Sequence, residues 1–152
     1  MSTVKPIPED YPQVIPYLSV KGANAAIDFY AAVLGATERM RLPGPDGTIG
    51  HAEINIGDSL VMLADVSPGM GQTPGDLGGS PVTIMVYVED VDAVCKKAVE
   101  LGATMDREIE DQFYGDRAGG FIDPFGHKWH IATHVEDVEP EEMERRIAAL
   151  SG

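Results

Sequence analysis

Short runs of apolar residues interspersed with polar ones recur along the chain, and turn-forming glycine, proline and aspartate residues separate them. The runs span 37–42, 49–56, 59–64, 105–109, 120–122 and 128–133. Runs of this kind are typical of half-buried β-strands. One further strand is predicted before each set of three, within 14–20 and within 81–88.

Two stretches have apolar residues three and four positions apart, which is the spacing of an amphipathic helix. In ANAAIDFYAAVLGAT this spacing relates Ala26, Phe29 and Val33, and Gly35 stands where a helix ends in the left-handed conformation. The stretch DVDAVCKKAVELGAT ends in the same way at Gly102. A helix is therefore predicted between the first and the second strand of each set.

The two sets of elements are copies of one pattern, because both helical stretches end on Leu-Gly-Ala-Thr and each lies between one strand and three further strands. The order is βαβββ in a first module at about 14–65 and again in a second module at about 81–134. A chain of 152 residues has the usual length of one domain, so we expect a single α+β domain over 1–152.

The modules are joined by a segment at 66–80 that is too rich in glycine and proline to be predicted as helix or strand. It is either a functional flap or an inert connector. After the second module, Pro140 suits the first position of a helix, and a C-terminal helix is predicted at about 139–150. Ile147 and Leu150 are expected to pack this helix against the rest of the chain.

Acidic residues outnumber basic ones by 25 to 11, which gives a formal net charge of −14. This charge repels phosphate backbones and anionic membrane surfaces, so neither nucleic acid nor a membrane is an expected partner. The chain starts without a cationic and apolar leader, and no apolar run nears the roughly 20 residues that span a bilayer, so we expect a cytoplasmic protein. The single cysteine, Cys95, lies on the apolar side of the second helix and is expected to be buried.

Four stretches together resemble one known family. They are AIDFYAAVLGA, HAEINIGDSLVMLAD, VEDVDAV and FIDPFGHKWHIATHVEDV. Their order and spacing resemble the vicinal oxygen chelate superfamily, also called glyoxalase/bleomycin resistance/dioxygenase, and its PhnB-like branch in particular. The resemblance covers Val14 to about Asp137 and implies two curled mixed sheets that face each other around a cavity. It also implies a homodimer.

Members of this family often hold a divalent metal on four side chains, and the resemblance places those positions at Ile15, Met62, Thr83 and His130. The internal repeat agrees, because both pairs of related positions are 68 residues apart. Isoleucine offers no donor atom and methionine only a soft thioether, so His130 is the only credible ligand. We therefore expect no metal at the usual positions, and Zn²⁺, Ni²⁺ or Mn²⁺ would need a displaced site.

Residues two apart on a strand face the same way, so strand parity indicates which side chains share the cavity with these positions. They are Tyr17 and Ser19 on the strand of Ile15, and Met85 and Tyr87 on the strand of Thr83. Apart from Ser19, they are expected to bind the ligand together with Met62 and Thr83. Tyr17 and Tyr87 are expected at related places in the two modules, either as aromatic walls for a ligand or as ordinary packing. Their neighbours Leu18, Val20 and Val82 are expected in the core.

In the strand HAEINI, Ala52 and Ile54 are expected in the core, so His51 and Glu53 face the cavity. Glu53 and His130 are the candidate acid and base, or, together with His51, the ligands of a displaced metal site with two histidines and one carboxylate. The alternative is that these side chains only hydrogen-bond to one another or to water on a half-exposed sheet face.

Tyr114 and Arg117 belong to a loop that runs near the cavity mouth in similar proteins. Arg117 is either a partner for an anionic ligand group or a solvated arginine. His127 and His134 flank the last strand and are expected at the surface, whereas Trp129 has the parity of a core residue.

Two classes of function remain open, and the fold alone does not choose between them. The first is a protein that binds a small organic molecule without a metal, which the residues at 15, 62 and 83 favour. The second is a glyoxalase-like lyase or isomerase, in which Glu53 and His130 move a proton with or without a displaced metal.

Overall fold

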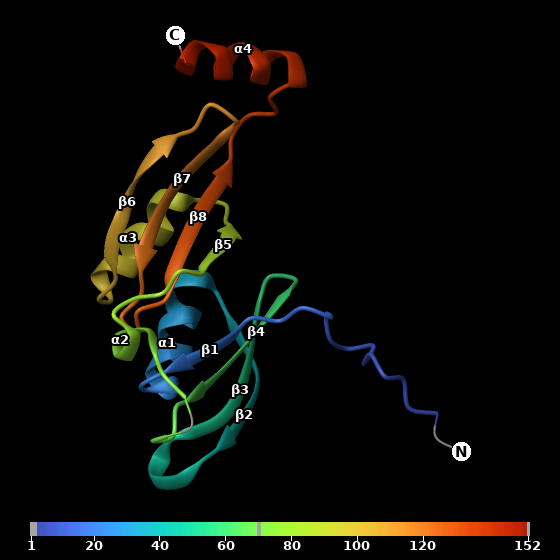
Figure 1. The fold of residues 1–152 in the computed structure, drawn as a ribbon, viewed down its shortest axis with the longest axis vertical. Helices are drawn as coiled ribbons and strands as arrows, with labels where there is room; N and C mark the ends of the chain where they lie inside the picture. The colour runs from blue at the N-terminus through green and yellow to red at the C-terminus, as the bar shows by residue number, and fades with distance from the viewer. Residues whose placement is uncertain (1–2, 70, 152) are drawn as a thin grey trace. The chain divides into compact units, whose positions relative to one another are not determined.

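The computed structural model describes residues 3–69 and 71–151, and the chain divides into two compact units, Met1–Gly79 and Ser80–Gly152. Figure 1 shows that each unit contains one four-stranded sheet with a helix beside it. No helix among the described residues is long and apolar enough to cross a membrane.

The first unit has the order strand, helix and three strands. Its elements are β1 (Tyr17–Val20), α1 (Ala23–Leu34), β2 (Thr37–Pro43), η1 (Pro45–Gly47), β3 (Ile49–Ile56) and β4 (Ser59–Asp65). The strands lie in the order β1-β4-β3-β2, with β1 parallel to β4 and the other pairs antiparallel.

The second unit repeats this order. Its elements are β5 (Thr83–Tyr87), α3 (Val91–Glu100), β6 (Thr104–Asp111), β7 (Asp116–Ile122), β8 (Lys128–His134) and α4 (Pro140–Ser151). The strand order β5-β8-β7-β6 has the same parallel first pair, and its other pairs are antiparallel. The predicted α+β class, the two βαβββ modules and the C-terminal helix are therefore confirmed.

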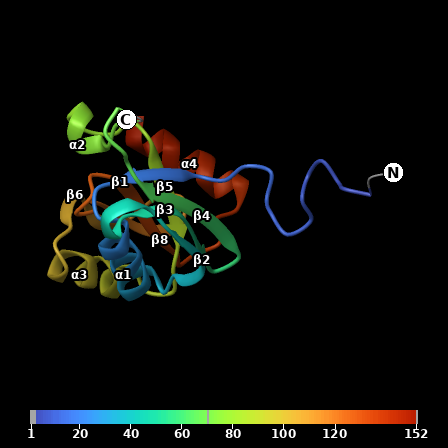
Figure 2. The same cartoon turned by 90° about the horizontal axis from the view of Figure 1, so that it is seen from below.

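The core of the first unit lies between α1 and the sheet, as the helical spacing predicts (Figures 1 and 2). Ala26, Phe29 and Val33 are buried on the helix, and Leu18 and Val20 are buried on β1. Removing these apolar side chains from water is the main driving force for docking the helix. The predicted alternation along β1 is therefore confirmed.

The ends of α1 are held by two different devices. The N-terminus has no side-chain cap of its own, but Oδ1 of Asp65, at the end of β4, accepts from the N–H groups of Gly22 and Ala23 over 2.7 and 2.9 Å. Oδ2 of the same carboxylate accepts from the N–H of Ile49. A negative charge at this end also suits the helix dipole. At the other end, Gly35 adopts the predicted left-handed conformation with φ 67°.

The core of the second unit forms around Trp129, which is fully buried, as its parity predicts. Its indole Nε1 donates to Oδ2 of Asp123 over 2.8 Å. Phe121 on β7 and Val91 and Cys95 on α3 are also buried. The predicted burial of the single cysteine is therefore confirmed.

The connecting segment contains a one-turn helix, α2 (Pro74–Leu77), so the prediction that it holds neither helix nor strand is wrong. The side chain of Thr73 accepts from the N–H of Asp76, whose carboxylate accepts from the N–H of Thr73. Proline occupies the first position and Gly78 ends the turn at φ 81°. Both residue types thus stand at the helix ends, where they are tolerated. Met70, in the same segment, lies outside the described residues.

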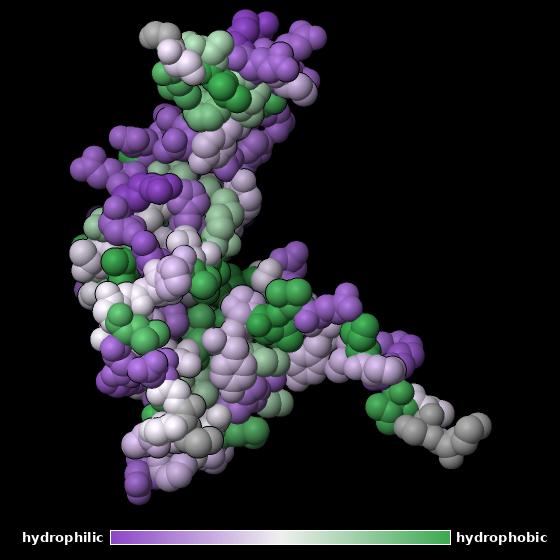
Figure 3. All heavy atoms as spheres, viewed as in Figure 1, coloured by the Kyte–Doolittle hydropathy of each residue, from purple (hydrophilic) through white to green (hydrophobic). Residues whose placement is uncertain are grey.

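Charged side chains, and not the predicted apolar ones, attach α4. Ile147 and Leu150 are 48% and 68% exposed, so the prediction that they pack the helix is wrong. Figure 3 shows hydrophobic residues on the surface of this helix, at the top of the view. Arg146 donates from Nη1 to the carbonyl of Phe113 over 2.8 Å and pairs with Glu136. The loop before β7 therefore holds the helix.

The sheet register corrects one expected relationship between the modules. Tyr17 pairs with Met62 in the first unit, and Met85 pairs with His130 in the second. Since Met62 and His130 are related by the 68-residue repeat, the counterpart of Tyr17 is Met85. The prediction that Tyr17 and Tyr87 occupy related places is therefore wrong, because Tyr87 lies two residues beyond the counterpart of Tyr17 on the same face of its strand.

Three strand starts differ from the prediction by more than one residue. Since β5 starts at Thr83, Val82 precedes it and is exposed, so its expected place in the core is wrong. β1 starts after Pro16, whose ring nitrogen has no hydrogen to donate to a neighbouring strand. β7 starts at Asp116, four residues before the predicted strand. The prediction missed this start because the small residues there give no alternating pattern of apolar and polar side chains.

Candidate functional site

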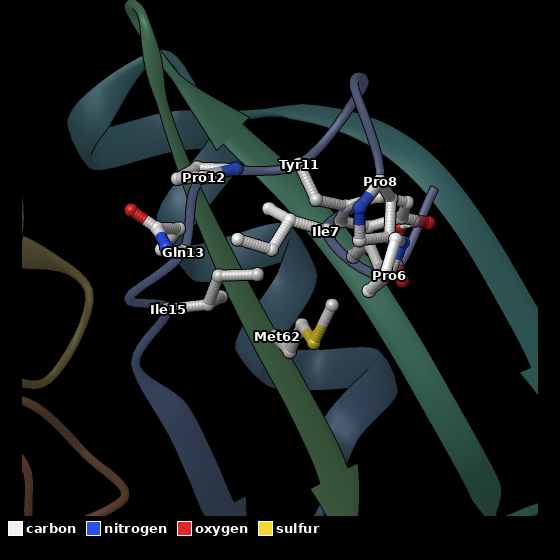
Figure 4. Close-up of a pocket in the computed structure, with 9 residues that line it drawn as sticks. Pro6, Ile7, Pro8, Tyr11, Pro12, Gln13, Ile15 and Met62 are labelled. Carbon is white, nitrogen blue, oxygen red and sulfur yellow. Dashed lines mark hydrogen bonds between the residues drawn. The ribbon is translucent and has the colours of Figure 1, made fainter. Parts of the chain in front are cut away.

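A pocket of about 520 Å³ lies on the face of the first unit's sheet that α1 does not cover. It is lined by Pro6, Ile7, Pro8, Tyr11, Pro12, Gln13, Ile15, Glu53 and Met62. Figure 4 shows the N-terminal segment passing over β4, with the side chains of Ile7, Ile15 and Met62 directed into the space between them. The walls are mostly apolar, and Glu53 supplies the only charge among the lining residues.

Glu53 is the polar centre of this pocket. It lies on β3 between two core residues, and only 3% of it is exposed. Its Oε1 accepts from the Tyr11 hydroxyl over 2.9 Å, and its Oε2 lies 2.8 Å from Nε2 of His51. Nε of Arg39 lies 3.6 Å from Oε1. The structure thus brings His51 and Glu53 together and adds two partners from other parts of the unit.

The carboxyl of Glu53 is held in its ionised form. Burial raises its pKa, but the hydrogen bonds with His51 and Tyr11, followed by the electrostatic interactions with His51 and Arg39, outweigh burial, so the pKa of Glu53 lies below its ordinary value. The same hydrogen bond raises the pKa of Tyr11. The guanidinium of Arg39 also lies 4.3 Å from the centre of the Tyr11 ring, a cation–π distance. Sequence reasoning missed Tyr11, because its segment has no periodic pattern.

Tyr17 extends this network to the surface. Its hydroxyl oxygen lies 2.7 Å from Nδ1 of His51. Since the ionised Glu53 can only accept, Nε2 of His51 donates to it, and in the neutral form of the ring Nδ1 is the acceptor for the Tyr17 hydroxyl. Burial, followed by the charge of Glu53, raises the pKa of Tyr17. These three residues, the Tyr17–His51–Glu53 triad, run from an exposed phenol to a buried carboxylate.

The two metal positions of the first unit, Ile15 and Met62, form part of the apolar wall of the pocket. Isoleucine has no donor atom and the methionine thioether is a weak, soft ligand, so these residues do not fit a hard divalent ion. Within 3–69 and 71–151, no three His, Cys, Asp or Glu side chains form a group that could hold a metal. The donor set therefore disagrees with the metal that the resemblance implies.

The corresponding positions of the second unit, Thr83 and His130, line a smaller pocket of about 260 Å³. The other residues that line it are Asp106, Arg107, Gly120, Lys128 and Trp129. Nζ of Lys128 lies 3.7 Å from Oδ2 of Asp106. The candidate acid–base residues Glu53 and His130 thus belong to different units, and each lines a pocket of its own unit.

Arg117 is engaged in ion pairs. Its Nε and Nη2 donate to the two carboxylate oxygens of Asp92 over 2.8 and 2.9 Å, and its Nη1 donates to Asp111 over 3.2 Å. A fork of this kind matches a carboxylate well. The guanidinium of Arg117, one possible partner for an anionic ligand, is thus already paired with carboxylates of α3 and β6 and links these elements to β7.

The three remaining candidates of the second unit lie at its surface. Met85 and Tyr87 are exposed on β5, and Tyr114 is partly exposed in the loop before β7. The Tyr114 ring packs edge-on against Phe113, with 5.3 Å between the ring centres. Tyr87 is hydrogen-bonded within the unit.

Asp116 is a buried carboxylate that sequence reasoning missed. Its Oδ2 accepts from the Tyr87 hydroxyl over 2.8 Å, and its Oδ1 lies 2.8 Å from Nδ1 of His134. Nε2 of His134 lies 2.7 Å from Oδ1 of Asp137. The hydrogen bonds to Asp116 and then to Asp137 raise the pKa of His134. The one signal in the sequence was an acidic residue two positions before a run of small and apolar ones, Ala118 to Ile122.

Comparison with known proteins adds a family and several relatives. A family model described as the Glyoxalase/Bleomycin resistance protein/Dioxygenase superfamily matches residues 13–131. The protein Mb0911c of Mycobacterium bovis is 43% identical over 142 residues, which cover 91% of this chain and 93% of that protein.

Two solved structures are similar in both fold and sequence. The structure of the Arabidopsis thaliana gene product At5g48480 has a TM-score of 0.65 and 28% identity, and the match covers 80% of this chain and 98% of that one. TioX from Micromonospora sp. ML1 has a TM-score of 0.63 and 25% identity, with 82% and 99% covered.

Proposed function

Because the chain belongs to the glyoxalase/bleomycin resistance protein/dioxygenase superfamily, we propose that it binds a small organic molecule in the pocket of its first unit. The observation that carries this proposal is an apolar pocket of about 520 Å³ built around one buried carboxylate. Apolar walls with a few placed polar groups are typical of small-molecule sites. The proposed site works without the family's usual metal, because Ile15 and Met62 form part of the apolar wall of the pocket and are not suitable metal ligands.

The state of Glu53 favours binding over proton abstraction by this carboxylate. A carboxylate whose pKa lies below its ordinary value is a weak base at neutral pH. It has about four lone-pair sites, and Tyr11 and His51 take two of them in short hydrogen bonds. A donor group of a ligand can therefore use the remaining sites, and the net charge of −14 favours a neutral or cationic ligand.

The pocket can be tested with Nile red, a neutral fluorophore whose emission rises in apolar surroundings. Ile15→Trp fills the pocket and is expected to weaken dye binding at least about tenfold, or ~1.4 kcal/mol. Val14→Trp is the matched control, because Val14 is 87% exposed and does not line the pocket. The control variant should bind the dye with the same affinity as the wild type. Treatment of both proteins with a chelator should leave dye binding unchanged, because the proposed site needs no metal. Equal weakening in both variants, or no saturable binding by the wild type, contradicts the proposal.

The second candidate is a glyoxalase-like lyase or isomerase that uses Glu53 and His130 as acid and base or as ligands of a displaced Zn²⁺, Ni²⁺ or Mn²⁺. The observation that favours it is the 2.8 Å contact between the imidazole of His51 and Glu53, the carboxylate that lines the pocket. A thermal shift induced by one of these metals in chelator-treated protein, and lost in both Glu53→Ala and His130→Ala, would support this candidate over the first.

We also propose that the protein is a cytoplasmic homodimer of the PhnB-like branch. The order and spacing of the four stretches that carry the resemblance support the branch, and the family resemblance supports the dimer. A single cysteine fits a reducing compartment. Light scattering on the purified chain tests the dimer, since it gives a mass of either one or two chains.

A further inference from the structure

We propose that Tyr17 is a nucleophile, that His51 activates it as a general base, and that Glu53 is the positioning residue for His51. The ligand class is an acyl compound with a good leaving group. This activity goes beyond the binding function, because it assigns a covalent step to the Tyr17–His51–Glu53 triad.

The geometry of the triad follows the logic of an activated nucleophile. The Tyr17 oxygen lies 2.7 Å from Nδ1 of His51, and Nε2 of His51 lies 2.8 Å from Oε2 of Glu53. Exposure falls along the series, since Tyr17 is 52% exposed while the side chains of His51 and Glu53 are 25% and 4% exposed. The reactive end is thus accessible, while the group that orients the base is shielded from water.

The hydrogen positions assign each residue its role. Glu53 is ionised and accepts from Nε2 of His51, so the neutral form of His51 presents the lone pair of Nδ1 to the Tyr17 hydroxyl. The pKa of Tyr17 is raised by burial and by Glu53, so its phenol is protonated at neutral pH and needs a base when it attacks. Nδ1 of His51 is the atom placed to take that proton.

The step balances without a further reactant. The phenolic oxygen of Tyr17 attacks the acyl carbon and forms a C–O bond, while its proton moves to Nδ1 of His51. Glu53 stabilises the resulting imidazolium by its charge. The bond to the leaving group then breaks, the leaving group takes the electron pair, and the imidazolium returns its proton to it or to water. The product is an acyl ester of Tyr17.

The second unit contains a natural comparison. Tyr87 is 60% exposed, close to the exposure of Tyr17, but its hydroxyl donates over 2.8 Å to a carboxylate, Asp116, and not to an imidazole. The order of groups is thus tyrosine, aspartate and histidine, with His134 on the far side of Asp116. The hydrogen bond to Asp116 raises the pKa of Tyr87, and the acceptor of this bond is a carboxylate and not an imidazole base.

The test uses 4-nitrophenyl acetate on the purified full chain. Acetylation of each tyrosine is followed by tandem mass spectrometry, and release of 4-nitrophenolate is followed by its absorbance. Tyr17 is expected to be acetylated about 100-fold faster than Tyr87, the lower range of general-base catalysis. His51→Gln should reduce the rate at Tyr17 to that at Tyr87, and added imidazole should partly restore the rate in His51→Ala.

Two further measurements separate these roles from a loss of folding. An unchanged thermal unfolding curve in every variant shows that the first unit, which contains the substituted residues, remains folded, and the rate at Tyr87 in the second unit serves as the reference for reagent reactivity. Glu53→Gln should change the pH dependence of acetylation at Tyr17, because an amide cannot stabilise the imidazolium by charge, whereas a merely structural defect would lower the rate equally at every pH. Equal rates at Tyr17 and Tyr87 in the wild type, or no effect of His51→Gln, would overturn the proposal. The result is read on Tyr17 itself, so it does not depend on dye binding.

Discussion

Nδ1 of His134 lies 2.8 Å from Oδ1 of Asp116, a residue that is only 4% exposed. The other ring nitrogen lies 2.7 Å from Oδ1 of Asp137, so the imidazole bridges two carboxylates. Asp116 begins β7 and Asp137 follows β8, and the bridge therefore links a buried strand end to the segment that leads into α4.

We predict that His134→Asn destabilises the protein more at mildly acidic than at alkaline pH. The two carboxylates raise the pKa of His134 above its ordinary 6.5 in the folded state. A raised pKa contributes stability that is complete below the unfolded-state pKa and is lost as the pH rises through the folded-state pKa. Thermal unfolding from about pH 5.5 to about pH 9 should therefore give a Tm difference between wild type and variant that shrinks as the pH rises. A difference that stays constant or grows would contradict the role of the bridge.

The turn before β7 depends on a glycine. Gly115 has φ 101°, and a Cβ atom there would overlap the carbonyl oxygen of Glu136. The Gly115 carbonyl also accepts from the N–H groups of Val135 and Glu136 over 2.9 and 3.0 Å. Gly115→Ala is therefore expected to push the segment before α4 off the strand end and to lower the free energy of unfolding measured with urea.

The matched control for this substitution is Gly57→Ala, in the turn between β3 and β4. Gly57 also has a positive φ, 58°, but a Cβ atom there meets nothing within 4 Å. This control should cost roughly 1–2 kcal/mol, which is the penalty of the left-handed conformation alone. Gly115→Ala should lower the free energy of unfolding clearly more than Gly57→Ala does. An equal loss in both variants would show that the structure relieves the overlap with Glu136 without losing stability.

Asp123 organises the turn between β7 and β8. Its Oδ1 accepts from the N–H groups of Phe125 and His127 over 2.8 and 3.0 Å, and its Oδ2 accepts from the Trp129 indole over 2.8 Å. Asp123→Ala removes this acceptor from a buried place and should destabilise the protein by roughly 1–3 kcal/mol. Because Trp129 is the single tryptophan, its fluorescence follows urea unfolding directly. Asp58→Ala, in an exposed turn, should leave the unfolding midpoint within the error of the measurement.

Periodicity and turn residues predicted most of the fold, because these signals are local. The spacing of Ala26, Phe29 and Val33 placed α1 and its buried side, and Gly35 placed its end. The prediction for β3, 49–56, matches the observed strand at both ends. Signals of this kind need only a few neighbouring residues, and the structure agrees with them.

Contacts between distant residues were beyond sequence reasoning. Tyr11 and Glu53 are 42 positions apart, and nothing in the pattern of the N-terminal segment indicates that it returns to β3. Tyr87 and Asp116 are 29 positions apart and come together only through the register of the second sheet. Strand parity thus gave Tyr17, His51 and Glu53, and the family resemblance gave Ile15 and Met62. Tyr11 and Arg39, which contact Glu53, came only from the fold.

We predict that Cys95 resists alkylation in the folded protein. Burial, with a smaller contribution from the charge of Asp92, raises the pKa of the Cys95 thiol to about 11. The thiolate is the reactive form, so very little of it is present near neutral pH. In a mass-spectrometric time course with iodoacetamide, labelling of the native protein should be slower than labelling in denaturant by roughly 100-fold or more. Native labelling at the denatured rate would show that α3 opens readily from its sheet, and would contradict the buried core that places Cys95 against it.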